Sequence, residues 1–187
     1  MKKIIAVISL LLVIGFLPGC ATMQSSSVKM APKSSFTSLP KTIIIAPIGI
    51  KKGLKEEWRN FYVKMVGEEG FKEGREILYQ IFQKEFSGSD LKILKETTES
   101  DYLLVQFEIG EYGLNVVMMV GTFGQYSKAV LTELKVLKMP ESALLMNHKA
   151  QTVEHWFLWN RTLFYNSIST SGERVAKLLK TKLKKGE

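Results

Sequence analysis

Strict alternation of apolar and polar residues in the middle of the chain is the feature that most limits its fold. Between Tyr102 and Tyr112 the apolar residues occupy every second position, at Leu103, Val105, Phe107 and Ile109. Gln106 and Glu108 lie between them and share the opposite face. Such alternation is typical of a strand with one buried and one open face. The chain is therefore expected to build a sheet whose apolar face is covered.

Other segments add strands to this sheet. Residues 126–138 alternate in the same way, a turn follows at Met139–Ser142, and residues 143–154 are expected to return as an antiparallel partner. The run at 42–48 contains three consecutive Ile, which is typical of a strand buried on both faces. Residues 91–94 are a shorter candidate strand.

Helical spacing of apolar residues predicts helices over 55–66, over 77–86 and near the C-terminus. Thr170–Glu173 matches a capping box and is expected to begin the last helix. The glycine-rich stretch 67–75 weakens a helix, so a kink or loop is expected there. The predicted fold is α+β, a mostly antiparallel sheet of four to five strands with helices on one face, in the order β-α-β-β-β-β-α.

The N-terminus has the pattern of an export signal. After a basic start, an uncharged run from Ile4 to Phe16 is too short for a membrane span of about 20 residues, and suits a secretory signal. It ends at Leu17, Pro18, Gly19 and Cys20. These four residues resemble the lipobox of bacterial lipoproteins, which has an aliphatic residue, a small residue before the cleavage point and then Cys. Pro18 departs from the small residue that is usual at its position.

The resemblance implies a signal peptide at 1–19, cleavage before Cys20 and lipid on that cysteine, as diacylglycerol and usually a fatty acyl chain such as palmitate. Two or more chains anchor a protein stably. Ala21 stands where inner-membrane lipoproteins usually carry Asp. This favours the outer membrane, facing the periplasm of a Gram-negative cell; otherwise the protein would lie on the extracytoplasmic face of the cell membrane. An ordinary signal or uncleaved anchor with an incidental Cys is the other interpretation.

The rest of the chain divides into two parts. Residues 20–40 are Ser-rich without periodicity, which predicts a flexible tether. Residues 41–187 are expected to form a single domain. The formal charge is +8, and removal of residues 1–19 leaves +6. Nucleic acid is not expected as a partner, whereas the Lys-rich C-terminal helix either approaches an anionic surface or is simply solvated.

Residues with catalytic or metal-binding chemistry are few. The single Cys excludes an intrachain disulfide and a Cys-based zinc site. His148 and His155 would lie on opposite faces of one strand. Residues 67–75 carry three Glu and lack the Gly-Lys-Ser/Thr end of a phosphate-binding loop. We therefore expect no enzyme, no metal and no cofactor.

Two apolar segments are either part of the sheet and core or contacts for a partner. One is bracketed by glycines at 113–124, and the other is the aromatic run at 156–159. The candidate partner-binding residues are Leu114, Val116, Val117, Met118, Met119, Phe123, Trp156 and Trp159.

The later part of the chain carries a broader resemblance. The strand–helix–strand opening, the strand at Asp101–Val105, the Gly121–Gly124 link and the final Lys-rich helix are similar to small periplasmic lipoprotein domains of the CsgG, LpoB and TolB N-terminal kind. The resemblance covers roughly residues 41–184. It implies a membrane-anchored accessory or assembly protein that acts through protein contacts. The alternative is a lipid or lipopolysaccharide binder in an envelope transport pathway, which would need a continuous apolar cavity.

Overall fold

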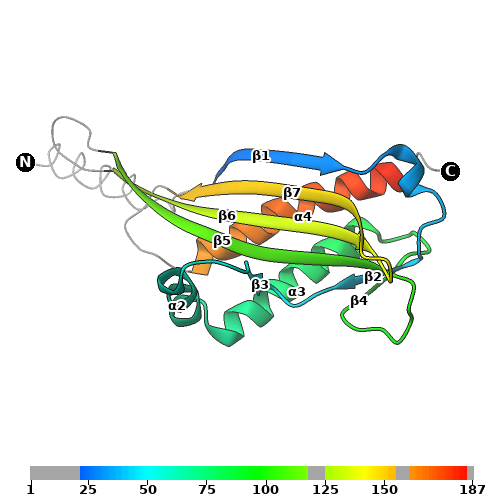
Figure 1. The fold of residues 1–187 in the computed structure, drawn as a ribbon, viewed down its shortest axis with the longest axis horizontal. Helices are drawn as coiled ribbons and strands as arrows, with labels where there is room; N and C mark the ends of the chain where they lie inside the picture. The colour runs from blue at the N-terminus through cyan, green and yellow to red at the C-terminus, as the bar shows by residue number, and fades with distance from the viewer. Residues whose placement is uncertain (1–21, 118–124, 155–160, 185–187) are drawn as a thin grey trace, which may run out of the picture.

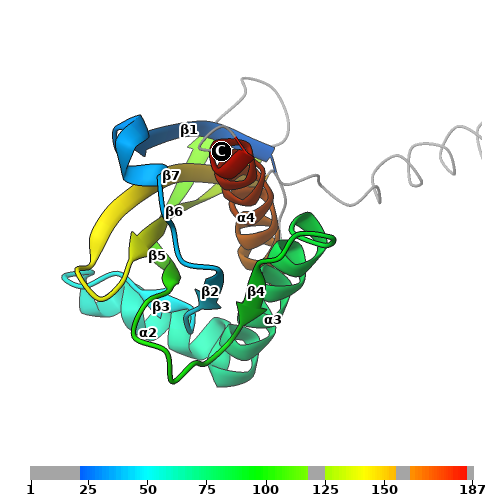
Figure 2. The same ribbon diagram turned by 90° about the vertical axis from the view of Figure 1, so that its right-hand side faces the viewer.

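The computed structural model describes residues 22–117, 125–154 and 161–184, in which a curved sheet carries helices on one face (Figures 1 and 2). In chain order the elements are β1 (Thr22–Met30), the 3-10 helix η1 (Lys33–Phe36), β2 (Thr42–Ile45), β3 (Gly49–Ile50), α2 (Glu56–Met65), α3 (Gly67–Glu85), β4 (Lys92–Leu94), β5 (Leu103–Val117), β6 (Gln125–Lys138), β7 (Ala143–Glu154) and α4 (Arg161–Lys184). The predicted α+β fold is confirmed.

The sheet is larger than predicted and mixed in direction. Its seven strands run in the order β1-β7-β6-β5-β2-β4, and β3 pairs with β5 beyond the end of β2. The long pairings β1–β7, β6–β7 and β5–β6 are antiparallel. β2 lies parallel to both β4 and β5, and β3 lies parallel to β5. Short parallel strands at one side therefore extend a long antiparallel meander.

The predicted alternation decides which face of the meander is buried. Leu103, Val105, Phe107 and Ile109 of β5 are fully buried against the helices. A bulge then interrupts the alternation, because Gly110 and Glu111 together lie opposite one residue of β6. Beyond the bulge β5 and β6 remain paired up to Val117 and Gln125.

α3 and α4 cross at glycines, and the kink or loop predicted at 67–75 is confined to the first residue of the stretch. Gly67, with φ +70°, separates α2 from α3, and the rest of the stretch is helical. A Cβ added at Gly74 would lie 2.7 Å from Ile168 Cδ1 and 3.1 Å from the Phe164 ring. A Cβ at Gly172 would lie 2.7 Å from Leu78 Cδ1. The glycines therefore allow close packing of two helices, which outweighs their weak helix propensity.

Two further boundaries differ from the predictions. α4 begins at Arg161, so the Thr170–Glu173 motif lies inside the helix, where Thr170 Oγ1 donates to the Asn166 carbonyl at 2.7 Å.

The tether prediction is wrong for β1 and η1. β1 is an edge strand that pairs with β7 from Thr22 opposite Val153 to Met30 opposite Met146. Backbone pairing holds this Ser-rich segment in the sheet, together with Val28 and Met30, which pack against the core.

Candidate binding groove on the open face of the sheet

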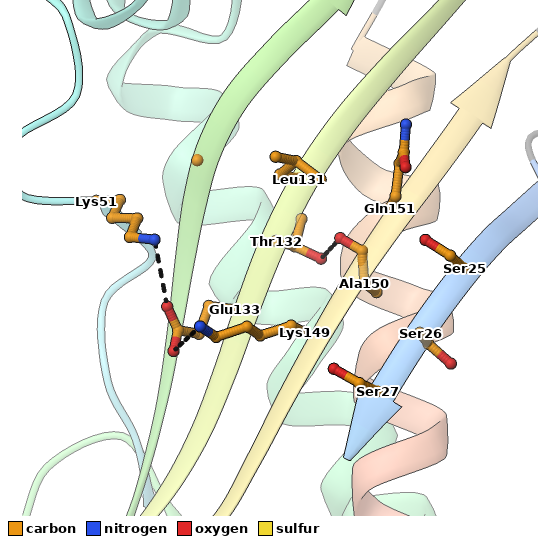
Figure 3. Close-up of a pocket in the computed structure, with 11 residues that line it drawn as sticks. Ser25, Ser26, Ser27, Lys51, Leu131, Thr132, Glu133, Lys149, Ala150 and Gln151 are labelled. Carbon is orange, nitrogen blue, oxygen red and sulfur yellow. Dashed lines mark hydrogen bonds and ion pairs between the residues drawn. The ribbon is translucent and has the colours of Figure 1, made fainter. Parts of the chain in front are cut away.

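A shallow groove lies on the face of the sheet that α3 and α4 leave uncovered (Figure 3). The strand register places Ser25, Gln151, Leu131 and the bulge residue Gly110 in one row across four strands. Gly110 and Ser25 fill little space in this row, which lines a hollow of about 310 Å³. The residues that line it are Ser25, Ser26, Ser27, Lys51, Gly110, Leu131, Thr132, Glu133, Lys149, Ala150 and Gln151.

The bulge in β5 fixes one wall of this groove. A Cβ at Gly110 would lie 3.3 Å from the carbonyl oxygen of Leu131, so glycine permits the close approach of β5 and β6. The carbonyl of Gly110 accepts a hydrogen bond of 3.0 Å from the hydroxyl of Tyr62, a buried residue of α2. α2 therefore holds the bulge in place from the other side of the strand.

The next row across the sheet carries charge. Glu133 is only 8% exposed although it belongs to the open face. Its carboxylate accepts a hydrogen bond from Asn147 Nδ2 at 2.8 Å. The ammonium groups of Lys51, Lys135 and Lys149 lie 3.8, 3.9 and 3.9 Å from it. Burial alone would raise the pKa of Glu133, but the Asn147 hydrogen bond and the three lysines together hold it below its ordinary value.

The charged row beside the groove is built from ion pairs. A carboxylate with a lowered pKa is a weak general base at neutral pH. Glu108 lies directly opposite Glu133 and pairs with Lys135 at 3.1 Å, so the group holds two carboxylates and three ammonium groups. Lys51 and Lys149 reach Glu133 from opposite sides, and their side chains are 51% and 58% exposed (Figure 3). One positive charge therefore stands in excess beside the apolar floor at Leu131, which is 43% exposed.

His148 lies on the other face of the sheet, within the core. It is 1% exposed, and neither ring nitrogen has a hydrogen-bond partner among the described residues. Burial, followed by the nearby Arg174 guanidinium, lowers the pKa of His148 to about 4. His155 lies outside the described residues. Within the described ranges, no three His, Cys, Asp or Glu side chains are grouped to hold a metal ion.

The predicted contact residues do not line this groove where the structure describes them. Leu114, Val116 and Val117 belong to the end of β5 and pair in register with Lys128, Tyr126 and Gln125. This portion therefore continues the sheet, which was one of the two interpretations of the segment. The residues outside the described part are Leu17, Pro18, Gly19, Cys20, Met118, Met119, Phe123, Trp156 and Trp159.

Sequence reasoning missed the groove, although one signal was present. Glu108 and Glu133 occupy polar positions of two alternating strands, and Lys135 follows Glu133 on the same face. Opposite charges on one face of paired strands indicate cross-strand ion pairs. The Ser-rich wall of the groove gave no such signal, because β1 was not predicted to be a strand.

Comparison with known proteins finds similarity in structure only. No family model matches the chain, and no curated protein matches it. A PelC dodecamer structure from Paraburkholderia phytofirmans is 10% identical and has a TM-score of 0.42, with 81% of this chain and 96% of that chain covered. A DUF330 protein from Xanthomonas campestris is 8% identical with a TM-score of 0.40, covering 89% and 97%.

The similar structures also include a minor lipoprotein from Acinetobacter baumannii, 6% identical with a TM-score of 0.32, covering 76% of this chain and 91% of that one. At such identities the function of this chain has to be argued from its own residues. In the part of the chain that the structure describes, no helix has the length and apolarity needed to cross a bilayer.

Proposed function

We propose that this chain is an envelope lipoprotein, anchored through lipid on Cys20, that acts as a non-enzymatic accessory or assembly protein by binding another protein. The lipobox at Leu17–Cys20 supports the anchor, and Ala21 supports an outer-membrane position facing the periplasm. The observation that carries the binding role is the groove on the helix-free face of the sheet.

The chemistry of the groove suits a protein partner. Its floor at Leu131 can accept an apolar side chain, and the lysines on either side of Glu133 can pair with an acidic group. Because Glu133 is held by the four groups around it, the charge pattern is fixed before a partner arrives. Fixed, complementary charges select a partner and its orientation more than they add affinity.

A second candidate contact region is the apolar end of the β5–β6 hairpin with the aromatic run that follows β7. It contains the residues proposed from sequence, namely Leu114, Val116, Val117, Met118, Met119, Phe123, Trp156 and Trp159. Aromatic residues and Met are enriched in protein interfaces.

The lipid-carrier alternative finds less support. It requires a continuous apolar cavity, whereas the space between sheet and helices is occupied by fully buried side chains that include Phe82, Phe107 and Phe164. The groove lies instead on the outer face and carries charged groups. We therefore keep protein contact as the proposal.

Photo-crosslinking in intact cells tests it. A photo-reactive amino acid at Gln151 should give protein adducts, while one at Gln80, an exposed position on α3, should give far fewer. Leu131→Arg should reduce the Gln151 adducts at least tenfold by filling the groove. Val63→Arg places the same side chain on an exposed valine of α2 and should leave them unchanged.

Equal adduct yields from both arginine variants would contradict the groove as the binding surface. Adducts to lipid alone would favour the alternative. Mass analysis of protein purified from its native membrane should find lipid on residue 20, and an unmodified Cys20 would remove the anchor from the proposal.

A further inference from the structure

One end of the sheet, which we call the hairpin end, is set by four aligned strands. Thr22 of β1 lies opposite Val153, Val153 lies opposite Ala129, and Ala129 lies opposite Gly113. These residues mark a line across the sheet at the start of β1. The strands differ in how far they continue past this line, and the parts beyond it differ in charge from the parts before it.

Among the described residues, only β5 and β6 continue well beyond the line. Four residue pairs follow, from Leu114 opposite Lys128 to Val117 opposite Gln125. At about 3.3 Å per residue, this extension adds about 13 Å to the sheet. Figure 1 shows β5 and β6 running past the start of β1 at the left of the view.

The charge pattern of the two strands changes at the same line. Before it, the strands carry Glu108, Glu133 and Lys135 on the open face, and Glu111 follows in the bulge. Between Glu111 and Lys128 the sequence contains no charged residue. Tyrosine is enriched where proteins meet the membrane interface, and Tyr126 lies on this extension, opposite Val116.

The position of the lipid anchor identifies the membrane as the partner of this extension. This step rests on the proposed function, in which Cys20 carries lipid. Cys20 precedes Thr22 by two residues, so at no more than about 3.6 Å per residue it lies within about 7 Å of the start of β1. A lipid-bearing cysteine lies at the membrane surface. The surface therefore lies close to the line through Thr22, while the hairpin extends about 13 Å past that line.

We propose that the hairpin end of β5 and β6, Leu114–Val117 with Gln125–Lys128, enters the headgroup region of the membrane leaflet that holds the Cys20 lipid. The molecule then has two attachments to one leaflet, a covalent lipid and a hairpin end in which Lys128, at its base, is the one charged residue among the eight named. This assigns the described end of β5 and β6 to lipid and leaves the groove for the protein partner.

Depth-dependent fluorescence quenching tests this assignment. The full-length protein is made with its own signal, purified from membranes and reconstituted in phosphatidylethanolamine–phosphatidylglycerol vesicles that contain brominated lipid. Because lipid occupies the only natural cysteine, Val116→Cys provides one thiol for a fluorophore. The matched control is Lys92→Cys at the start of β4, which lies at the opposite end of the sheet.

The label at position 116 should be quenched at least threefold more than the label at position 92. Tyr126→Cys, the register partner of Val116, should give the same result and guards against a local folding defect in one strand. Equal quenching at 116, 126 and 92, with lipid confirmed on residue 20, would overturn the hairpin assignment and leave the anchor intact. Absence of lipid on residue 20 would overturn both.

Discussion

Glu133 shows how one residue can be buried on a face that is otherwise open. Its neighbours across the strands are Glu108 on one side and Lys149 on the other, and Lys51 reaches it from the segment after β3. Removing one member of such a group leaves the remaining charges without a partner. The resulting loss of stability is larger than the net stabilisation that the intact group provides. The charged row is thus a source of local order.

Glu133→Gln should destabilise the fold by about 1–3 kcal/mol at pH 7, because three lysines would lose their shared carboxylate. Urea unfolding followed by circular dichroism measures this. Glu57→Gln, at an exposed acid on α2, should change stability by less than about 0.5 kcal/mol. If the two substitutions lower the free energy of unfolding equally, Glu133 contributes no more to stability than an exposed carboxylate does.

His148 should make stability fall as the solution becomes acidic. It is neutral in the fold, with a pKa of about 4, whereas the unfolded chain takes up a proton near pH 6.5. Unfolding therefore binds a proton in this window, and stability is present above pH 6.5 and is lost as pH falls toward 4. Between pH 7 and pH 5 the loss is about 2 kcal/mol.

The measurement is the urea unfolding free energy at pH 7 and pH 5 for wild type and for His148→Leu. The variant should lose most of this pH dependence. Glu133, whose pKa lies below its usual value of 4.5, contributes its own loss only at lower pH. A wild-type difference of less than about 0.5 kcal/mol would contradict a neutral buried His148.

Among the elements, the crossing of α3 and α4 depends most on residue size. Gly74→Leu should destabilise the fold by about 2–3 kcal/mol, because its side chain would collide with Phe164 and Ile168. Gln80→Leu adds the same side chain at an exposed position of α3 and should have little effect. Thermal unfolding distinguishes them, and a Gly74→Leu variant as stable as wild type would show that the helices can separate without cost.

The elements that sequence predicted well are those with a strong apolar period. β5, β6, β7 and α2 have one buried face, so burial and sequence pattern coincide. The failures have a shared cause. β1 is held by backbone hydrogen bonds and presents serines, while the glycines of α3 serve a neighbour that is distant in sequence. Neither kind of constraint leaves a periodic signal in its own segment.

Amide hydrogen exchange should decide between the strand and the predicted tether. Amides of β1 that donate to β7 should exchange at least a hundredfold more slowly than those of an unstructured peptide of the same sequence. The Ala31 amide, which donates to the Leu145 carbonyl at 2.9 Å, should also be protected. Unprotected exchange of the amides throughout residues 22–31 would contradict the strand and support the predicted tether.

For the whole molecule, the position of the Lys-rich helix end is set by the length of α4. The helix has 24 residues and is about 36 Å long. Lys180, near its end, pairs with Glu85 at 3.4 Å, and Lys184 lines the same hollow as Phe36 and Lys41. The C-terminal end of α4 lies at the end of the sheet opposite to the start of β1 (Figure 1). An anchor at Cys20 would hold this helix end away from the membrane.

Reversal of charge at this far end should therefore leave membrane attachment unchanged. Lys177→Glu with Lys184→Glu should not alter the fraction of lipidated protein bound to anionic vesicles at 0.05 M or 0.5 M salt, as measured by flotation. A salt-dependent loss of binding in the double variant alone would indicate that the Lys-rich helix does contact the membrane.

The groove illustrates what sequence could not supply at this scale. The residues that line it belong to β1, β5, β6, β7 and the segment that follows β3. Ser25, Gln151 and Leu131 lie in one row only because the strands pair in this register. A shift of one residue in any pairing would turn the corresponding side chain to the other face. Alternation identifies the face of each strand, but not its alignment with the next.

The short link between Cys20 and β1 also determines how the fold would bear a mechanical load. Tension on the lipid would act along β1, parallel to its strand axis, and so would shear its bonds to β7 together rather than separating them one at a time. The eight paired positions from Thr22 to Met30 would share that tension. A lipoprotein pulled by a moving partner would then keep β1 in its sheet until all of these pairings with β7 failed together.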